Sequence, residues 1–96
     1  MSKVFFAWDS KKATGNLAKH GVSFAEAQGV FMDGDARLID DPDHSEFERR
    51  FVLLGYSLQA RCLIVNHCYS DDDSVIRLIS ARKATAKEEK DYWRNR

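Results

Sequence analysis

Residues 75–85 have the sequence VIRLISARKAT, and this segment decides the fold expected for the chain. It is an apolar run that contains Arg77 and ends with Arg82 and Lys83, a pattern that predicts a β-strand followed directly by a helix. Because burying an unpaired charge is costly, an arginine within a strand needs an acidic partner, an exposed edge or an anionic ligand. Guanidinium groups on a sheet are suited to recognising phosphate or carboxylate.

Helix caps and short links divide the rest of the chain into further elements. Asp9 is expected to cap a helix that ends at Gly21, and capping boxes that begin at Ser23 and Thr85 predict two more helices. The expected strands are residues 4–8, 36–40, 49–57, 61–69 and 75–82, and the expected helices are residues 9–20, 23–31 and 85–93. Short links between the last three strands predict an antiparallel meander. The order β-α-α-β-β-β-β-α indicates a single α+β domain over residues 1–96, a two-layer fold with an antiparallel sheet and helices packed on one face.

Size and composition restrict the class of protein. A chain of 96 residues with 44% hydrophobic residues supports one domain with a modest core. No apolar run approaches the length of a membrane span, and the segment before the first strand is too short for a signal peptide. Cys62 and Cys68 fall on one predicted strand, too far apart to form a disulfide, so we expect reduced thiols in a cytoplasmic protein. The cysteines and histidines match no zinc spacing, and we expect no metal site and no cofactor.

The formal net charge is zero, but the charges are unevenly distributed. Residues 1–22 contain four lysines and one acid, residues 33–48 contain seven acids and one base, and residues 77–96 contain seven bases and three acids. Two basic ends therefore flank an acidic middle. Because local fields matter more than their sum, zero net charge does not exclude an anionic substrate.

Several short motifs occur in a characteristic order along the chain. They are Trp8-Asp9 with Lys12 and Asn16, KHGVSF at 19–24 with Ala27, DPDHS at 41–45, Glu48-Arg49, and IRLISAR at 76–82 with Ala84, Glu88 and Tyr92. Together they resemble the BrnT family, the toxin half of a bacterial type II toxin–antitoxin pair, over nearly the whole chain. The resemblance implies a RelE-like ribonuclease fold.

The resemblance also implies an activity and a partner. The protein would cleave RNA, inhibit translation and arrest growth until a cognate BrnA-like antitoxin covers its active surface in a hetero-oligomer. That antitoxin would carry a DNA-binding domain of the ribbon-helix-helix type and repress the operon, so this chain would meet DNA only indirectly. Relatives often carry an acidic residue and an arginine where this chain has Tyr69 and Ser70. A catalytically inactive module of the same fold, which binds RNA or the antitoxin, is therefore the alternative.

Metal-independent RNA cleavage needs a base for the 2′-hydroxyl, an acid for the departing 5′-oxygen and cations for the charge on phosphorus. Four residues supply these types and are the expected catalytic residues: Arg77, Arg82, His67 and Glu48. Arg77 is expected to clamp phosphate on the uncovered face of the sheet or to form an ion pair with Glu48, and the two roles are compatible. His67 shares a face with apolar neighbours, so it is either a proton-transfer group or a histidine at the edge of the core.

Further cations are expected to contact RNA. They are Lys12, Lys19, Arg49 and Lys83, and for each the alternative is an ordinary solvated side chain. His20 lies in the last turn of the first predicted helix, where an imidazolium interacts favourably with the helix dipole. Capping is its default role, and proton transfer is the alternative.

Overall fold

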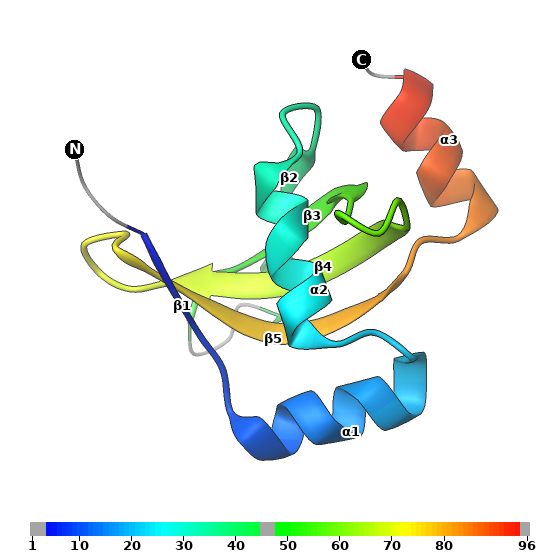
Figure 1. Cartoon of the computed structure of the whole chain (residues 1–96). Helices are drawn as coiled ribbons and strands as arrows, with labels where there is room; N and C mark the ends of the chain where they lie inside the picture. The colour runs from blue at the N-terminus through cyan, green and yellow to red at the C-terminus, as the bar shows by residue number, and fades with distance from the viewer. Residues whose placement is uncertain (1–3, 45–47, 95–96) are drawn as a thin grey trace.

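The computed structural model describes residues 4–44 and 48–94, which form one five-stranded sheet with helices beside it (Figure 1). The strands are β1 (Phe5–Ala7), β2 (Arg37–Asp40), β3 (Arg50–Tyr56), β4 (Cys62–Tyr69) and β5 (Val75–Lys83). The helices are α1 (Ser10–His20), α2 (Phe24–Gln28) and α3 (Ala86–Arg94), with the 3-10 turns η1 (Gly29–Met32) and η2 (Pro42–His44). The expected α+β class and the expected order of strands and α-helices are confirmed.

The sheet has the strand order β1-β5-β4-β3-β2. Strands β2 to β5 form the expected antiparallel meander, but β1 pairs parallel to β5, with Phe5 opposite Val75. The expectation of a wholly antiparallel sheet is therefore wrong at this edge. Parallel pairing needs a long crossover connection, and the chain between β1 and β5 is long enough to provide one.

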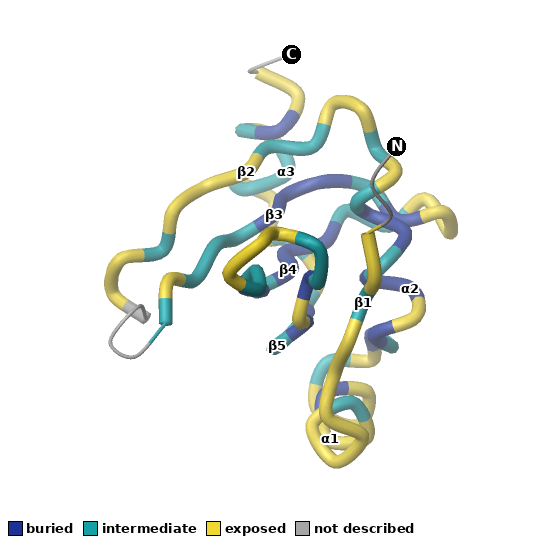
Figure 2. Tube along the Cα trace, turned by 90° about the vertical axis from the view of Figure 1, so that its left-hand side faces the viewer, coloured by how far each residue is buried: buried dark blue, intermediate teal, exposed yellow. Residues whose placement is uncertain are grey.

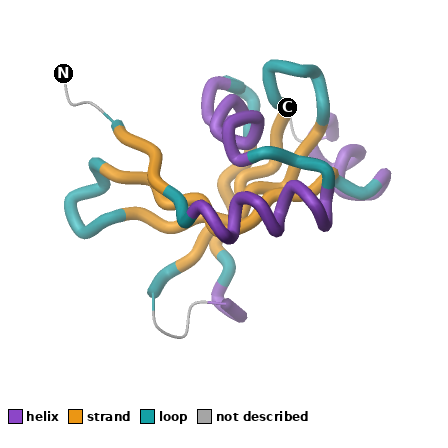
Figure 3. The backbone as a smooth tube through the Cα atoms, turned by 60° about the horizontal axis from the view of Figure 1, so that its bottom comes forward, coloured by secondary structure: helices purple, strands orange, loops and turns teal. Residues whose placement is uncertain are grey.

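Two helices cover one face of the sheet, as expected (Figure 3). The buried core lies between α2, the end of α1 and the inward side chains of β3, β4 and β5 (Figure 2). Its members are Val22, Phe24, Ala27, Val30, Leu53, Leu63, Val65, Ile76, Leu78 and Ala81.

Helix α3 differs from the expectation that the helices share one face. Its Tyr92 is buried against Leu54 and Ile64. Leu54 and Ile64 each lie next to a core residue on their strand. Because successive side chains of a strand alternate, both point to the face of the sheet opposite the core. Tyr92 is the one buried side chain of α3 within the described residues, because α3 has too little apolar surface to extend the main core.

The caps explain where the helices begin and end. Asp9 accepts a hydrogen bond from the Lys12 amide at 2.9 Å, and Gly21 ends α1 with φ of 69°. At the start of α3 the capping box is complete, because the Thr85 amide donates to Glu88 at 2.8 Å and the Glu88 amide donates to the Thr85 hydroxyl at 3.1 Å. These expected helix limits are confirmed.

The second capping box is only half formed. The Ser23 hydroxyl accepts from the Glu26 amide at 3.0 Å, but the Glu26 carboxylate turns away to Arg61, whose Nε donates to it at 2.9 Å, and to the Ser57 hydroxyl at 2.7 Å. This network ties α2 to the β3–β4 hairpin. Helix α2 ends at Gln28, earlier than expected, and the chain continues as the tighter turn η1.

Asn16 is a buried polar residue that joins α1 to β5. Its Nδ2 donates to the carbonyls of Val22 at 2.9 Å and Ala81 at 2.8 Å, and its Oδ1 accepts from the Ala81 amide at 3.0 Å. Strand β1 pairs with β5 only as far as Arg77. The Asn16 side chain therefore satisfies the backbone of β5 at Ala81, where β1 does not reach.

His67 is fully buried on the face covered by the helices. Its ring packs edge-on against Phe31 and Tyr69, with centroids 4.9 and 5.1 Å away. Its Nδ1 lies 3.1 Å from the Val65 carbonyl and its Nε2 lies 3.0 Å from the Tyr69 hydroxyl, so one neutral tautomer donates to the first and accepts from the second. Burial lowers the pKa of His67, which favours this neutral form.

We predict that Asn16→Ala destabilises the protein by about 3 kcal/mol, because it leaves buried backbone groups of Ala81 and Val22 without partners. Asn16→Asp is expected to be at least as harmful, since a carboxylate would face two carbonyls. Lys11→Ala, at an exposed position of the same helix, is the control and should change stability by less than about 0.5 kcal/mol. Urea unfolding measures all three, and equal losses in Asn16→Ala and Lys11→Ala would contradict the role of Asn16.

We predict that the neutral state of His67 makes stability depend on pH. The unfolded chain binds a proton at His67 near the ordinary pKa of 6.5. In the folded protein the pKa of His67 is lowered, so the proton binds only at lower pH. The free energy of unfolding should therefore fall as pH drops below 6.5, by up to about 1.4 kcal/mol per pH unit until the folded pKa is reached. Urea unfolding at several pH values should show this decline in wild type and in His20→Gln. A decline of the same slope in His67→Gln would show that another group causes it.

Candidate functional site

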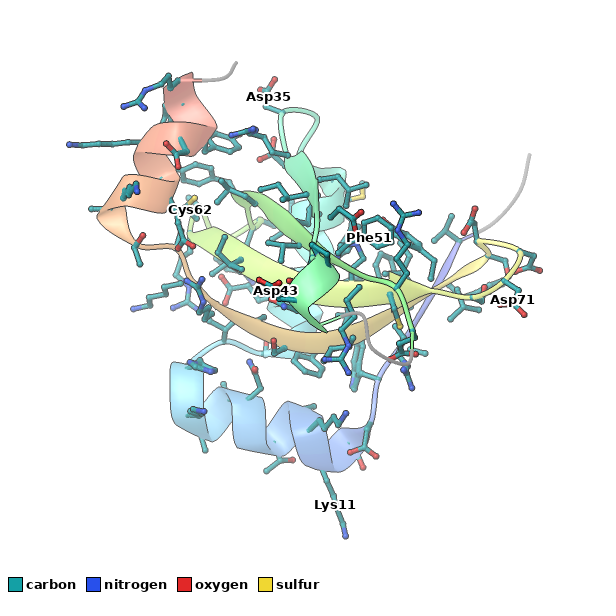
Figure 4. All side chains as sticks on the ribbon, turned by 180° about the vertical axis from the view of Figure 1, so that it is seen from behind. Lys11, Asp35, Asp43, Phe51, Cys62 and Asp71 are labelled. Carbon is teal, nitrogen blue, oxygen red and sulfur yellow. The ribbon has the colours of Figure 1, made fainter. Side chains whose placement is uncertain are left out.

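A groove of about 600 Å³ lies over the sheet face opposite α1 and α2. Outward side chains of β3, β4 and β5 form its floor, and β2, the end of α1 and the start of α3 form its walls. Figure 4 shows this side of the molecule, with the turn that carries Asp43 in front of the strands. The polar groups that this groove brings together include His20, Arg37, Asn66, Ser80 and Arg82.

Arg82 lies on the floor of the groove in a fixed orientation. Its two terminal nitrogens donate to the two oxygens of Glu88 at 2.8 and 2.9 Å. The same carboxylate accepts from the Thr85 amide, so Glu88 is itself held by the cap of α3. These bonds lower the pKa of Glu88 to about 2, and the bonds from Arg82 have the largest effect. The carboxylate therefore stays charged at neutral pH. The Arg82 side chain nevertheless keeps 42% of its surface exposed.

Arg77 lies on the same face of β5, towards the other end of the strand. In a regular strand Arg77 and Arg82 would point to opposite faces, because their positions differ by five, an odd number. The β4–β5 register shifts between Asn66 and His67, so that Asn66 pairs with Ser80 but His67 pairs with Leu78. The extra residue on β5 reverses the alternation and brings both arginines to the uncovered face.

Glu48 forms an ion pair with Arg77, and its Oε1 also lies 3.9 Å from Arg50 Nη2. The ion pair that the sequence indicated as one role for Arg77 is therefore present. Glu48 and Arg77 line a smaller pocket with Cys68, Tyr69, Ser70, Asp71 and Val75. The guanidinium of Arg77 remains half exposed.

The structure does not bring every expected site residue to this face. His67 is fully buried on the opposite face and does not line the groove. Lys83 pairs with the core residue Leu63, so it too points to the helix side. Lys12 and Lys19 are exposed on α1, outside the groove lining.

Arg49 lies near the start of β3, beyond the groove. Its Nη2 donates to Asp40 at 2.9 Å, and its guanidinium lies 5.0 Å above the ring of Phe51. With 70% of its side chain exposed, Arg49 can still contact a ligand at the surface.

The groove residues that were not among the expected site residues include two cationic or titratable ones, His20 and Arg37. His20 ends α1 and was assigned a capping role from its position in the helix, yet it lines the groove. Arg37 pairs with Leu54 across β2 and β3, which turns it to the groove side. Within the described residues Arg37 forms no ion pair. The alternation of side chains along β2 would have placed Arg37 in the groove, but only once the register of β2 with β3 was known.

In the part of the chain that the structure describes, no group of three or more histidine, cysteine, aspartate or glutamate side chains could hold a metal ion. No helix among these residues is long and apolar enough to cross a membrane.

Comparisons with known proteins agree with this architecture. The family of ribonuclease toxins called BrnT, of type II toxin–antitoxin systems, matches residues 8–88. The crystal structure of the Brucella abortus ribonuclease toxin BrnT superposes with a TM-score of 0.64 and 22% sequence identity, covering 88% of this chain and 99% of that one. No curated protein sequence matches significantly. Because the family match spans most of the chain, the protein belongs to the BrnT family of ribonuclease toxins of type II toxin–antitoxin systems, and an antitoxin is its implied partner.

Proposed function

We propose that this toxin is a metal-independent endoribonuclease that arrests growth by cutting RNA and so inhibiting translation. The observation that carries the proposal is the groove on the uncovered sheet face, where Arg37 and Arg82 lie with His20. An open face lined by guanidinium groups suits a phosphodiester backbone, because arginine binds phosphate in bidentate geometry. Membership of the family supports ribonuclease activity in general.

The residues of the groove and of the smaller pocket around Arg77 have distinct roles in this proposal. Arg82 and Arg37 stabilise the negative charge that develops on phosphorus, and Arg77 holds a neighbouring phosphate. His20 transfers a proton to or from the reacting oxygens, because imidazole titrates near neutral pH. Glu48 is the second proton-transfer candidate or orients Arg77. For His67 we favour the second of the two roles that the sequence indicated, a histidine of the core, because its side chain is fully buried.

RNA binding extends beyond the groove. Lys12 and Lys19 on α1 and the exposed Arg49 are proposed contacts to the RNA backbone, and they give an affinity that falls with salt. Lys83 faces the helix side, so it contacts RNA only if the RNA strand wraps around the end of β5.

We further propose that the cognate antitoxin is BrnA-like and covers the groove in a hetero-oligomer. A DNA-binding domain of the antitoxin would then repress the operon, and this chain would reach DNA only through its partner. The acidic walls of the groove, which include Asp40, Asp41 and Asp91, suit basic side chains of such a partner.

One observation favours a second candidate function, a catalytically inactive module that binds RNA or the antitoxin. Arg82, Arg77 and Arg49 each already contact a carboxylate, which neutralises part of their charge. An inactive protein would bind the same partners without cutting RNA.

We predict that Arg82→Ala lowers the rate of RNA cleavage by at least about 100-fold, because one charge-stabilising donor is lost. Arg82→Lys should also lose most activity, since an ammonium does not reproduce the bidentate fork. Purified proteins are compared on total RNA with and without EDTA, and the wild-type rate should not change with EDTA.

The control is Arg94→Ala, which removes an exposed arginine that does not line the groove. Circular dichroism shows whether each variant folds. A folded Arg82→Ala that cuts RNA as fast as Arg94→Ala would exclude the proposed site. A folded wild type that cuts no RNA would favour the inactive module.

We predict that His20→Gln, but not His67→Gln, removes one limb of the pH–rate profile. His20 lines the groove, whereas His67 is buried away from it. Cleavage of a short fluorescent RNA between pH 5 and 9, roughly the range over which imidazole titrates, provides the profile. An unchanged profile in His20→Gln would assign proton transfer to another group, with Glu48 the next candidate.

A further inference from the structure

A second pocket, of about 660 Å³, lies at the end of the sheet where β3 begins and β4 ends. Apart from Glu48 and Arg49, its lining residues have no role in the proposed binding and cleavage of RNA. Its apolar lining consists of Leu38, Phe51 and Tyr69, and its polar lining consists of Glu48, Arg49, Ser70, Asp71 and Asp73. Figure 4 labels Phe51 on its strand and Asp71 in the β4–β5 turn at the same end of the sheet.

The aromatic floor of the pocket is held rigidly. The rings of Phe51 and Tyr69 meet edge to face, with centroids 5.2 Å apart. The Tyr69 hydroxyl is fixed by His67, 3.0 Å away, and Leu38 beside them is 54% exposed. The two rings are inclined at 66°, so a planar ligand can stack on one ring and meet the edge of the other.

The polar rim is also preorganised. In the β4–β5 turn the Asp72 carboxylate accepts hydrogen bonds from the Ser70 hydroxyl at 2.9 Å and from the Ser74 hydroxyl and amide at 2.7 and 3.0 Å. The turn therefore has one shape, and the flanking Asp71 and Asp73 are exposed at the rim. Arg49 lies across the rim with its guanidinium 5.0 Å from the centroid of the Phe51 ring, so a base that stacks on Phe51 takes the place of this guanidinium.

The pocket adjoins the pocket around Arg77. The two share Glu48, Tyr69, Ser70 and Asp71. An RNA strand whose phosphate lies at Arg77 therefore has this pocket within reach of the attached nucleotide.

We propose that the pocket binds the nucleobase next to the phosphate at Arg77, and that it prefers guanine to uracil. This inference rests on the proposed ribonuclease function. Guanine presents two adjacent N–H donors, which suit one carboxylate of the rim, while Arg49 can donate to its carbonyl oxygen. The two carbonyl oxygens of uracil flank its single N–H and would face the carboxylates.

The lining favours a base over other occupants. A phosphate diester has no N–H or O–H donor for the three carboxylates of the rim, whereas the edge of a base has N–H donors. An apolar side chain of the antitoxin would cover the aromatic floor but would leave the charged rim without partners. A base has a flat apolar face and a polar edge, which is the arrangement of this lining.

The test is an NMR titration of the isotope-labelled protein with guanosine and uridine 5′-monophosphates. We expect shifts of the Phe51, Tyr69 and Asp71 amides and about tenfold tighter binding of the guanosine nucleotide. Asp71→Asn should reduce this preference to less than about threefold, and Phe51→Leu should weaken both nucleotides by about tenfold. Trp93→Leu, at an exposed aromatic residue on α3, is the matched control and should bind as wild type does.

Equal affinity for the two nucleotides, or shifts confined to the groove around Arg82, would overturn the proposal. The proposal would also be overturned if neither nucleotide bound the pocket while the cognate antitoxin protected it from hydrogen exchange, since its occupant would then be a protein. Asp71→Asn changes an exposed side chain, so it tests the preference even if Phe51→Leu fails to fold. Nucleotide binding needs no cleavage, so selective binding by a protein that cuts no RNA would overturn the proposed function and leave this inference standing.

Discussion

The contact between Asn16 and Ala81 determines how the two halves of the groove meet. Ala81 precedes Arg82 on β5, and Asn16 lies one helical turn before His20 on α1. The same side chain binds Val22, just after α1 ends. One buried amide therefore fixes the strand that carries an arginine, the helix that carries a histidine and the turn that follows that helix. A side chain serves here because β1 is too short to pair with this part of β5.

The register irregularity between β4 and β5 has an equally direct effect on the site. Without the extra residue on β5, either Arg77 or Arg82 would point into the apolar layer beneath α2, where a charge is costly. With it, the core keeps Leu78 and Ala81, and both arginines reach the uncovered face. Strand β5 thus supplies apolar side chains to the core and arginines to the site.

Local signals in the sequence were sufficient for most of the fold. Asp9, Gly21 and the Thr85–Glu88 box act within a few residues, and the helix limits they predicted are confirmed. The parallel pairing of β1 and the place of α3 depend on contacts between distant segments, which no local pattern encodes. For the same reason, His67 was correctly grouped with Leu63 and Val65, but the sequence did not show that helices cover that face. Arg37 and His20 could be placed in the groove only after the strand register and the position of α1 were known.

The carboxylates beside the arginines explain how a chain of zero net charge can present a site for an anion. Arg77 and Arg49 lie in exposed pairs, and such pairs contribute little to stability because solvent screens them. Glu48 and Asp40 therefore orient these guanidinium groups but bind them weakly, so that a phosphate can compete for them. Arg82 is held more firmly, because Glu88 is anchored by the cap of α3 and keeps its charge down to a pKa of about 2. Arg37 has no carboxylate partner within the described residues, so its charge is the least compensated in the groove. A phosphate entering the groove would therefore gain most at Arg37, and then meet an Arg82 already fixed in position.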